Sequence, residues 1–359
     1  MIKDTTFFSN RLISWYLSNK RDLPWRASSS PYHVWLSEVI LQQTKVAQGL
    51  PYYKAFVEKY PTVQDLANAS EDEVLVLWQG LGYYSRARNL HASAKYIVQE
   101  LNGVFPNTFK KLLELKGVGD YTASAIASIC YNEPEPVVDG NVYRVLSRIF
   151  GIDTPVPSSK AHREFKELGG VLMDKEQPGT FNQALMEFGA LQCIPRSPDC
   201  NQCVFATKCV ALQKNMVQSL PMRRSKTKVR KRYFNYFIIL SNQDSLAIQQ
   251  RLEDDIWYKL YELPLLESTS ALTKLQMLSA LQENSMFTEV DINSLQQINR
   301  KQIVHKLSHQ HLYTKFWILD AEVVNSSYIS INALNDYAFP RLIEEFLSTF
   351  LVEENLSVK

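Results

Sequence analysis

The sequence predicts an all-α domain followed by an α+β domain, and three observations support this prediction. Residues from about 7 to 211 place apolar side chains three and four positions apart between Gly, Pro and Asn turns, which is the period of amphipathic helices. After residue 232 the pattern changes to short β-branched and aromatic runs of strand length. A segment crowded with Lys and Arg separates the two patterns.

Composition sets the broad class of the protein. A chain of 359 residues with 45% hydrophobic residues can bury at least one full core, and its length allows two or three domains. The longest apolar runs, such as 233–240, fall far short of the ~20 residues that a membrane-spanning helix needs, so no membrane contact is expected. The N-terminus lacks the apolar core and cleavage site of a secretory signal, and a cytoplasmic location is expected.

The first notable helix contains a carboxylate among apolar residues. Three of the four helical neighbours of Glu38, namely Val34, Trp35 and Leu41, are apolar. Desolvation there would raise the pKa of Glu38, as a general acid working near neutrality requires. A surface Glu on an amphipathic helix is the competing interpretation.

Residues 112–128 read as a helix end, a Gly-Val-Gly turn and a helix of small residues, which is a helix-hairpin-helix pattern. Gly117 and Gly119 permit positive φ, so the turn around Val118 can present its amides beside the N-terminus of the next helix. One phosphate of a DNA backbone would fit there. A plain connector between helices is the alternative.

Asp139 lies in a turn that enters a helix, where an Asp commonly caps the N-terminus. We expect Asn141 to be at least as good a cap, and Gly140 would let the Asp139 carboxylate face a ligand. The helix end favours the ionised form. A protonatable Glu38 and an ionised Asp139 are the pair that glycosidic bond cleavage needs, provided that the fold brings them together.

Four of the five cysteines fall within 17 residues, at Cys193, Cys200, Cys203 and Cys209. This grouping is typical of a metal site and not of a disulfide framework, whereas Cys130 stands alone and is expected in the core. The asymmetric C-x6-C-x2-C-x5-C spacing favours a [4Fe-4S] cluster over zinc. Because four thiolates leave no iron position open, its role would be structural or DNA-positioning.

The basic segment 223–232 contains seven Lys and Arg residues and no acid, although the whole chain has a net charge of only +2. Such a run is either a solvated linker or a contact for a polyanion. We therefore predict domains at 1–215 and 233–359 with a basic linker at 216–232. In the second domain, strands are expected at 233–240 and 312–320 and helices at 270–283 and 340–351.

These features together resemble a known superfamily. Leu115-Lys-Gly-Val-Gly-Asp-Tyr-Thr122, Val137-Val-Asp-Gly-Asn-Val142 and the cysteine spacing resemble the helix-hairpin-helix base-excision DNA glycosylases over about 7–215. Segments 35–44, 79–86 and 181–186 are similar to MutY-type adenine glycosylases. The resemblance implies a helix-hairpin-helix glycosylase domain with an iron-sulfur loop. It also implies a monomeric, monofunctional enzyme of base excision repair that removes adenine opposite 8-oxoguanine or guanine in duplex DNA.

The resemblance also assigns roles to residues. Glu38 would protonate adenine at N7, Asp139 would stabilise the sugar cation, and Tyr121 and Asn141 would support them. Tyr121 stands where the endonuclease III branch has a Schiff-base Lys, and a phenol cannot form that imine. Because the adenine must flip out of the duplex, pocket and wedge residues are implied. Arg26 and Gln183 would hold the adenine, although many relatives have Glu at position 183, and the opposite 8-oxoguanine would meet Gln43, Thr44, Leu81 and Tyr83.

The second domain resembles the MutT-like, Nudix-fold domain of MutY proteins through 260–264 and 307–309. Ser308 and His309 would contact 8-oxoguanine, with Leu307 where the family often has Phe. His305, His309 and His311 would contact DNA or remain solvated. Residues 276–283 contain only one acid, so this domain is expected to bind and not to hydrolyse.

Two other functions are compatible with parts of the sequence. An endonuclease III-like glycosylase and lyase would act on oxidised pyrimidines, but Tyr121 and the appended second domain disfavour it. A non-catalytic iron-sulfur DNA-binding protein would use the scaffold as a sensor, but both carboxylates and the base-pocket residues are present.

Overall fold

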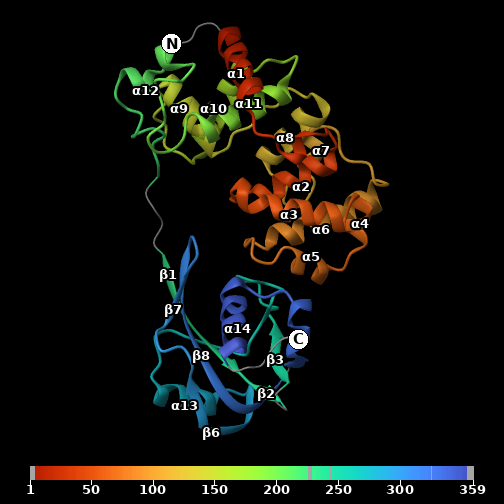
Figure 1. Cartoon of the computed structure of the whole chain (residues 1–359), viewed down its shortest axis with the longest axis vertical. Helices are drawn as coiled ribbons and strands as arrows, with labels where there is room; N and C mark the ends of the chain where they lie inside the picture. Colours follow the sequence, from red (N-terminus) through yellow and green to blue (C-terminus); the bar gives the residue numbers. More distant parts are fainter. Residues whose placement is uncertain (1–4, 225–228, 242–243, 325, 354–359) are drawn as a thin grey trace. The chain divides into compact units, whose positions relative to one another are not determined.

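The computed structural model describes residues 5–224, 229–241, 244–324 and 326–353. The chain divides into two compact units. One contains Met1–Asn68 and Asn89–Ser225, and the other contains Ala69–Arg88 and Lys226–Lys359 (Figure 1). No helix in the described ranges combines the length and apolar character needed to cross a membrane.

The first unit is helical, as predicted, and has no strand among its described residues. A short 3-10 helix, η1, lies at Pro24–Arg26, and a second, η2, at Ala206–Lys208. The α-helices are α1 (Thr5–Asn19), α2 (Pro31–Leu41), α3 (Val46–Lys59), α4 (Val63–Asn68), α6 (Ser85–Glu100), α7 (Phe109–Leu112), α8 (Asp120–Tyr131), α9 (Gly140–Phe150), α10 (Ser159–Leu172), α11 (Pro178–Leu191) and α12 (Val210–Gln213). Residues 85–88 at the start of α6 group with the second unit.

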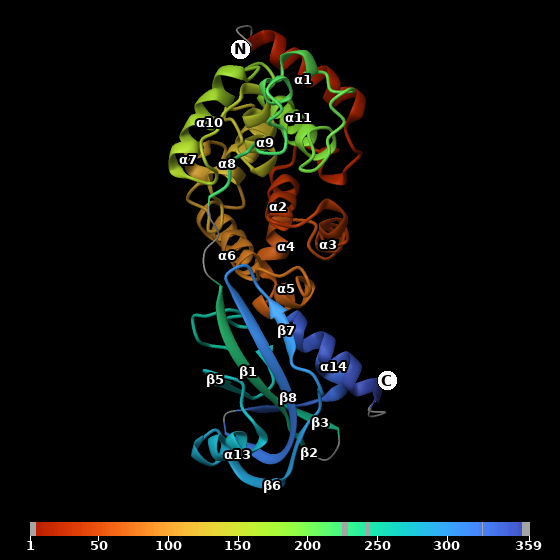
Figure 2. The same ribbon diagram turned by 90° about the vertical axis from the view of Figure 1, so that its left-hand side faces the viewer.

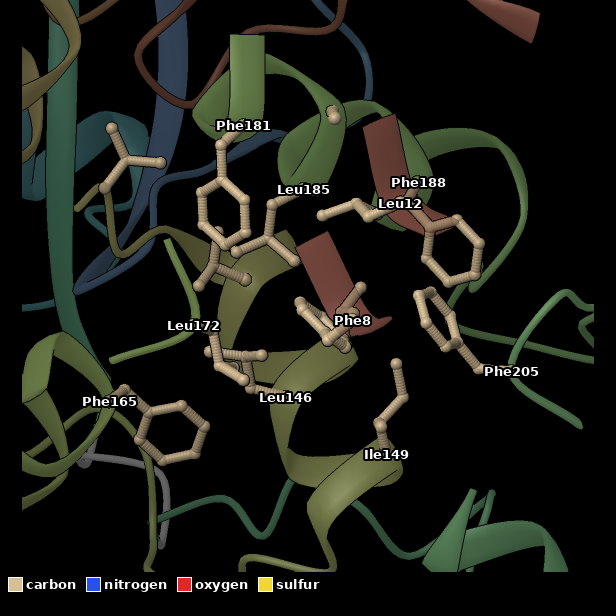
Figure 3. Packing of buried hydrophobic residues seen from close by; sticks show 14 of the residues in the cluster. Phe8, Leu12, Leu146, Ile149, Phe165, Leu172, Phe181, Leu185, Phe188 and Phe205 are labelled. Carbon is tan, nitrogen blue, oxygen red and sulfur yellow. The ribbon is translucent and has the colours of Figure 1, made fainter. Parts of the chain in front are cut away.

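Aromatic side chains fill the core where α1, α9, α10 and α11 meet (Figure 3). Phe8 of α1 stacks on Phe205 at 4.9 Å between ring centroids, and Phe188 of α11 meets Phe205 edge-on at 5.4 Å. Phe205 lies between the third and fourth cysteines of the loop, and its side chain is completely buried. The helical core therefore anchors the cysteine loop.

The second unit is built on two sheets, which confirms the α+β prediction. In the larger, the order is β5-β1-β8-β6 with β7 also paired to β8, and β1 runs parallel to β8. In the smaller, the order is β2-β3-β4 with β9 paired to β3. The elements are α5 (Glu71–Leu77), β1 (Arg230–Ile238), β2 (Leu240–Ser241), β3 (Ser245–Gln250), β4 (Tyr261–Glu262), β5 (Leu265–Ser268), α13 (Lys274–Glu283), β6 (Phe287–Gln297), β7 (Ile303–Lys306), β8 (Gln310–Val323), β9 (Ser327–Ser330), η3 (Ile331–Asp336) and α14 (Arg341–Glu353).

Alternation along β1 assigns one helix to each face of the larger sheet. Phe234, Tyr236 and Ile238 pack in one cluster with residues of α14, whereas Phe237 belongs to a second cluster with residues of α13. Successive strand residues point to opposite faces, which produces this division. Figure 2 shows α14 and α13 apart from each other beside the sheet.

Arg232 corrects part of the predicted linker. Residues 230–232 form the start of β1, and the Arg232 side chain is buried. Its guanidinium donates to both Glu267 carboxylate oxygens at 2.7 and 2.6 Å and pairs with Asp255 at 2.6 Å. Two carboxylates thus compensate a cation that the sequence placed in a linker, either solvated or in contact with a polyanion. Lys226 and Lys228 lie outside the described residues, and the linker boundaries remain a prediction.

Segment 69–88 belongs to the second unit, which the helical pattern did not predict. Glu71 pairs with Lys259 at 2.7 Å, and Arg88 donates to the Tyr258 carbonyl at 2.7 Å. The Gln79 side chain accepts from the Phe339 amide at 3.2 Å. The loop that contains Leu81 and Tyr83 is therefore flanked on both sides by residues that contact the α+β part of the same unit.

Candidate active site

Glu38 lies on α2, and its side chain is buried, as its apolar neighbours predict. Burial raises its pKa to about 7, and the negative charge of Asp139 contributes to the rise. A hydrogen bond with the Tyr121 hydroxyl and the positive charge of Arg26 act in the opposite direction. Near neutral pH this carboxyl can therefore both hold and release a proton.

A pocket of about 220 Å³ opens beside Glu38. Arg26 and Gln183, the two residues assigned to the flipped base, line it together with Glu38. Its other lining residues are Trp25, Ala27, Ser28, Ser29, Val34, Ser37, Ile129 and Met186. The structure thus brings an acid, a cation and an amide to the wall of one cavity.

Asp139 caps the N-terminus of α9, and one of its carboxylate oxygens accepts from the Val142 amide at 2.7 Å. The other oxygen accepts from the Asn141 side-chain amide at 2.8 Å. Burial raises the pKa of Asp139, whereas these hydrogen bonds and Arg144 lower it. Burial is the largest effect, so the pKa of Asp139 is raised overall, while the hydrogen bonds that both oxygens accept favour the ionised carboxylate.

The expectation that Asn141 caps this helix is wrong. The helix starts at Gly140, so Asn141 lies in the first turn and Asp139 takes the cap position. Instead, Asn141 links Asp139 to Arg144, whose Nη2 donates to the Asn141 Oδ1 at 2.8 Å. Asn141 therefore orients the carboxylate and connects it to a cation.

Tyr121, in the first turn of α8, connects the two acids. Its pKa is raised well above the ordinary value by burial and by the charges of Glu38 and Asp139, so the phenol stays protonated. The hydroxyl lies 3.1 Å from the Met186 Sδ and also hydrogen-bonds to Glu38. The three residues lie within electrostatic reach of one another, which answers the question that the sequence left open.

The hairpin before α8 differs from prediction at two positions. Gly117 has a φ of 76°, and a Cβ there would lie 2.7 Å from the Asn89 Cβ, so both conformation and space require glycine. Gly119, in contrast, has a φ of −94° and caps α8. The Val118 amide donates to the Leu115 carbonyl at 3.1 Å, so it is not free to bind a phosphate.

The residues assigned to 8-oxoguanine lie in both units. Gln43, with a φ of 56°, and Thr44 directly follow α2 in the first unit. Leu81 and Tyr83 lie in the second unit, where the Tyr83 ring is 49% exposed and Leu81 is buried. Of these two, only Tyr83 presents its side chain to solvent as a wedge would.

Ser308 and His309 form the exposed turn between β7 and β8. The turn is closed by the Leu307 amide, which donates to the Gln310 carbonyl at 2.8 Å. The Ser308 Oγ lies 3.4 Å from the His309 Nδ1. His305 is only partly exposed, its ring packs edge-on against Trp257, and burial lowers its pKa.

The four cysteines line one cavity together with Arg148. Arg148 is buried and donates to the Ile194 and Pro195 carbonyls at 2.8 and 3.0 Å, which fixes the start of the loop. Burial raises the pKa of Cys203 to about 11, and the other three thiols add to the rise. No group of three or more His, Cys, Asp or Glu that could hold a metal ion is found among the described residues.

Sequence reasoning missed Glu187 and Arg21. The Glu187 side chain is 1% exposed and accepts hydrogen bonds from both Arg21 and Arg26. The one available signal was helical spacing, because Glu187 follows Gln183 by four residues and therefore shares its face of α11. No motif pointed to Arg21.

Comparisons with known proteins agree with these observations. Residues 36–170 match the model of HhH-GPD superfamily base excision DNA repair proteins, and residues 235–349 match that of the NUDIX domain. Adenine DNA glycosylase of Buchnera aphidicola subsp. Schizaphis graminum is 33% identical over 307 residues, covering 85% of each chain. The human adenine DNA glycosylase is 46% identical over 222 residues, covering 59% of this chain and 41% of that protein.

Among solved structures, a thermostable thymine-DNA glycosylase matches with a TM-score of 0.55 and 28% identity. The match covers 59% of this chain and 98% of that chain. The match places the aligned part of this chain in the same fold as that DNA glycosylase. Because the Buchnera enzyme is 33% identical over 85% of both chains, this protein belongs to the MutY-type adenine DNA glycosylases, enzymes of base excision repair.

Proposed function

We propose that the protein is a monofunctional glycosylase that hydrolyses the N-glycosidic bond of adenine paired with 8-oxoguanine or guanine in duplex DNA. One observation supports this most directly: an acid with a pKa of about 7, Glu38, lines a pocket within electrostatic reach of a hydrogen-bonded carboxylate, Asp139. Near neutral pH Glu38 can hold the proton that the leaving base needs, and the hydrogen bonds to Asp139 favour the ionised form that would stabilise the sugar.

In this mechanism Glu38 donates its proton to N7 of the flipped adenine, which makes the base a better leaving group. The Asp139 carboxylate then stabilises the oxocarbenium-like sugar, and water completes the hydrolysis. Tyr121 hydrogen-bonds to Glu38 and Asn141 to Asp139, so both acids are oriented before the base arrives. Arg26 and Gln183 contact the adenine in the pocket.

The chemistry of Tyr121 supports hydrolysis without strand cleavage. A lyase step needs an amine to form an imine with the sugar, and a protonated phenol cannot supply one. The assay compares an 8-oxoguanine:A duplex with a thymine-glycol duplex and adds borohydride to trap any imine. We expect adenine release without a trapped adduct, whereas thymine-glycol cleavage with a trapped adduct would support the endonuclease III-like alternative.

Duplex binding would begin at the helix-hairpin-helix turn. The first amides of α8 lack partners inside the helix, and the helix dipole favours an anion at this end. With Val118 already bonded, we assign the phosphate to the backbone at Gly119 and beyond, while Gly117 shapes the turn. One monomer would then flip the adenine into the pocket.

Recognition of 8-oxoguanine is proposed for Gln43, Thr44, Leu81, Tyr83, Ser308 and His309. Ser308 and His309 project from an exposed turn and can offer a hydroxyl and a ring nitrogen to the oxidised base. We expect the double variant Ser308→Ala, His309→Ala to reduce adenine release from 8-oxoguanine:A more than release from G:A. Single-turnover rates on both duplexes give the ratio, and an unchanged ratio would show that this turn is misassigned.

The cysteine loop is proposed to hold a [4Fe-4S] cluster. The four cysteines line one cavity together with the buried Arg148, which provides a positive charge, although the described side chains do not yet form a group close enough to hold a metal ion. Cys193, Cys200, Cys203 and Cys209 would each bind one iron, and the cluster would brace the loop. We expect Cys203→Ser to lose iron and visible absorbance, whereas the control Cys130→Ser keeps both. Full iron content in Cys203→Ser would contradict this assignment.

A further inference from the structure

Glu187 lies outside the lining of the pocket and yet contacts a residue that forms it. Its carboxylate oxygens accept from the Arg26 Nη1 at 3.1 Å and the Arg26 Nη2 at 2.9 Å. The same oxygens accept from the Arg21 Nε at 2.9 Å and the Arg21 Nη2 at 2.6 Å. Two bidentate arginines therefore share one buried carboxylate.

This arrangement fixes Arg26 from several sides. Its Nη1 also donates to the Arg21 carbonyl at 3.1 Å, and its guanidinium lies 5.6 Å from the centre of the Tyr16 ring. The Tyr16 hydroxyl in turn donates to the Gln183 Oε1 at 3.0 Å. The contacts thus connect Glu187 to both pocket residues that would face the base.

The hydrogen bonds also determine which donors of Arg26 remain for a ligand. A guanidinium has five N–H donors, and the contacts to Glu187 and Arg21 use both Nη1 hydrogens and one Nη2 hydrogen. The Nε–H and the second Nη2–H are left for a purine. A freely rotating Arg26 would not present these two donors in a fixed direction.

We propose that Glu187 is a positioning residue that holds Arg26 in the base pocket and offsets the positive charge of Arg26 at Glu38. This inference rests on the proposed function, in which Glu38 is the proton donor. Glu187 does not touch the base. It acts through Arg26 on both the orientation of the base and the acidity of Glu38.

The effect of Glu187 on the charge state of Glu38 follows from the charged groups around each of these two carboxyls. Glu38 faces Arg26 from η1, Tyr121 and Cys130 from α8, and Asp139 from the cap of α9. Glu187 faces Arg21, Arg26 and Tyr16. Burial would raise the pKa of Glu187, but the two arginines outweigh it and lower the pKa to about 2. Glu187 therefore stays ionised wherever the enzyme is assayed and acts as a fixed negative charge.

Glu187→Gln tests the inference through a pH profile. The amide keeps the size of the side chain but leaves the Arg26 charge uncompensated, which favours the ionised form of Glu38. In single-turnover adenine release from 8-oxoguanine:A, the midpoint of the alkaline fall should move down by about half a pH unit. The variant should then be about threefold slower above that midpoint, in addition to any loss that is the same at every pH.

Arg21→Gln should move the midpoint of the pH profile in the opposite direction. It removes the outer cation, which is 35% exposed, and leaves Glu187 to neutralise Arg26 alone. The midpoint should then move up, because less positive charge remains near Glu38. Glu262→Gln is the matched control, because Glu262 is also a buried carboxylate paired with an arginine, Arg251, but lies in the second unit. Its midpoint should equal that of the wild type.

The outcomes separate the inference from the proposed function. A wild type that releases no adenine refutes the function itself. An active wild type with the same midpoint in Glu187→Gln overturns the inference, and so does a downward shift in all three variants, which would indicate general loosening. If Glu187→Gln fails to fold, Arg21→Gln decides the question. A raised midpoint in that variant supports the inference, whereas an unchanged or lowered midpoint overturns it.

Discussion

Glu38→Gln is expected to slow adenine release by about 10²–10⁴-fold, which is the contribution of a positioned general acid. Gln has nearly the same shape but cannot donate a proton to N7. The buried position of Glu38 accommodates a neutral amide without the desolvation cost of a carboxylate. Thermal unfolding should therefore show equal or higher stability while single-turnover kinetics show the loss.

DNA binding supplies the control for this variant. Because the hairpin and the turn at Ser308 are untouched, Glu38→Gln should bind the 8-oxoguanine:A duplex as tightly as the wild type. A variant that binds normally and cleaves at the full rate would remove Glu38 from the mechanism.

Asp139→Asn is expected to slow base release by at least about 10²–10³-fold, to the point where little product forms, while binding survives. The charge at the sugar disappears, but Asn caps a helix about as well as Asp, so the hydrogen bond from the Val142 amide can remain. The second contact is lost. If the oxygen of the new side chain accepts from the Val142 amide, its NH2 group faces the NH2 group of Asn141, and two donors meet. Quench-flow or single-turnover assays measure the rate.

Ser158→Ala distinguishes catalysis from capping. Ser158 caps α10 by accepting from the Ala161 amide at 3.1 Å, and its removal should cost about 1 kcal/mol of stability. That variant should melt earlier and cleave at the wild-type rate. Equal rate losses in Ser158→Ala and Asp139→Asn would show that helix stability, and not charge, limits the reaction.

Local patterns predicted the parts of the site that depend on nearby residues. The burial of Glu38 follows from apolar neighbours on its own helix, and Gly117 adopts the positive φ that its turn requires. The cap at Asp139 was misassigned to Asn141 because the cap depends on the residue at which the helix begins. If the helix began two residues later, Asn141 would be the cap and Asp139 would lie before the helix.

Long-range partners could not be predicted in the same way. Arg232 is buried because Asp255 and Glu267 compensate it, and Arg26 is held by Glu187, 161 positions further along the chain. Segment 69–88 reads as part of the helical domain, yet its Glu71 pairs with Lys259. Each case depends on a charge pair between residues far apart in the sequence. Neither the composition nor the helical or strand periodicity of the sequence indicates which charges will meet in the fold.

The pH dependence of adenine release tests the central claim most directly. The claim is that a protonated Glu38 and an ionised Asp139 act together on one adenine. Single-turnover rates on an 8-oxoguanine:A duplex from about pH 5 to about pH 9 should change little below the Glu38 pKa of about 7. Above it they should fall about tenfold per unit as the proton is lost. A rate that stays level or rises above pH 7 would contradict Glu38 as the acid.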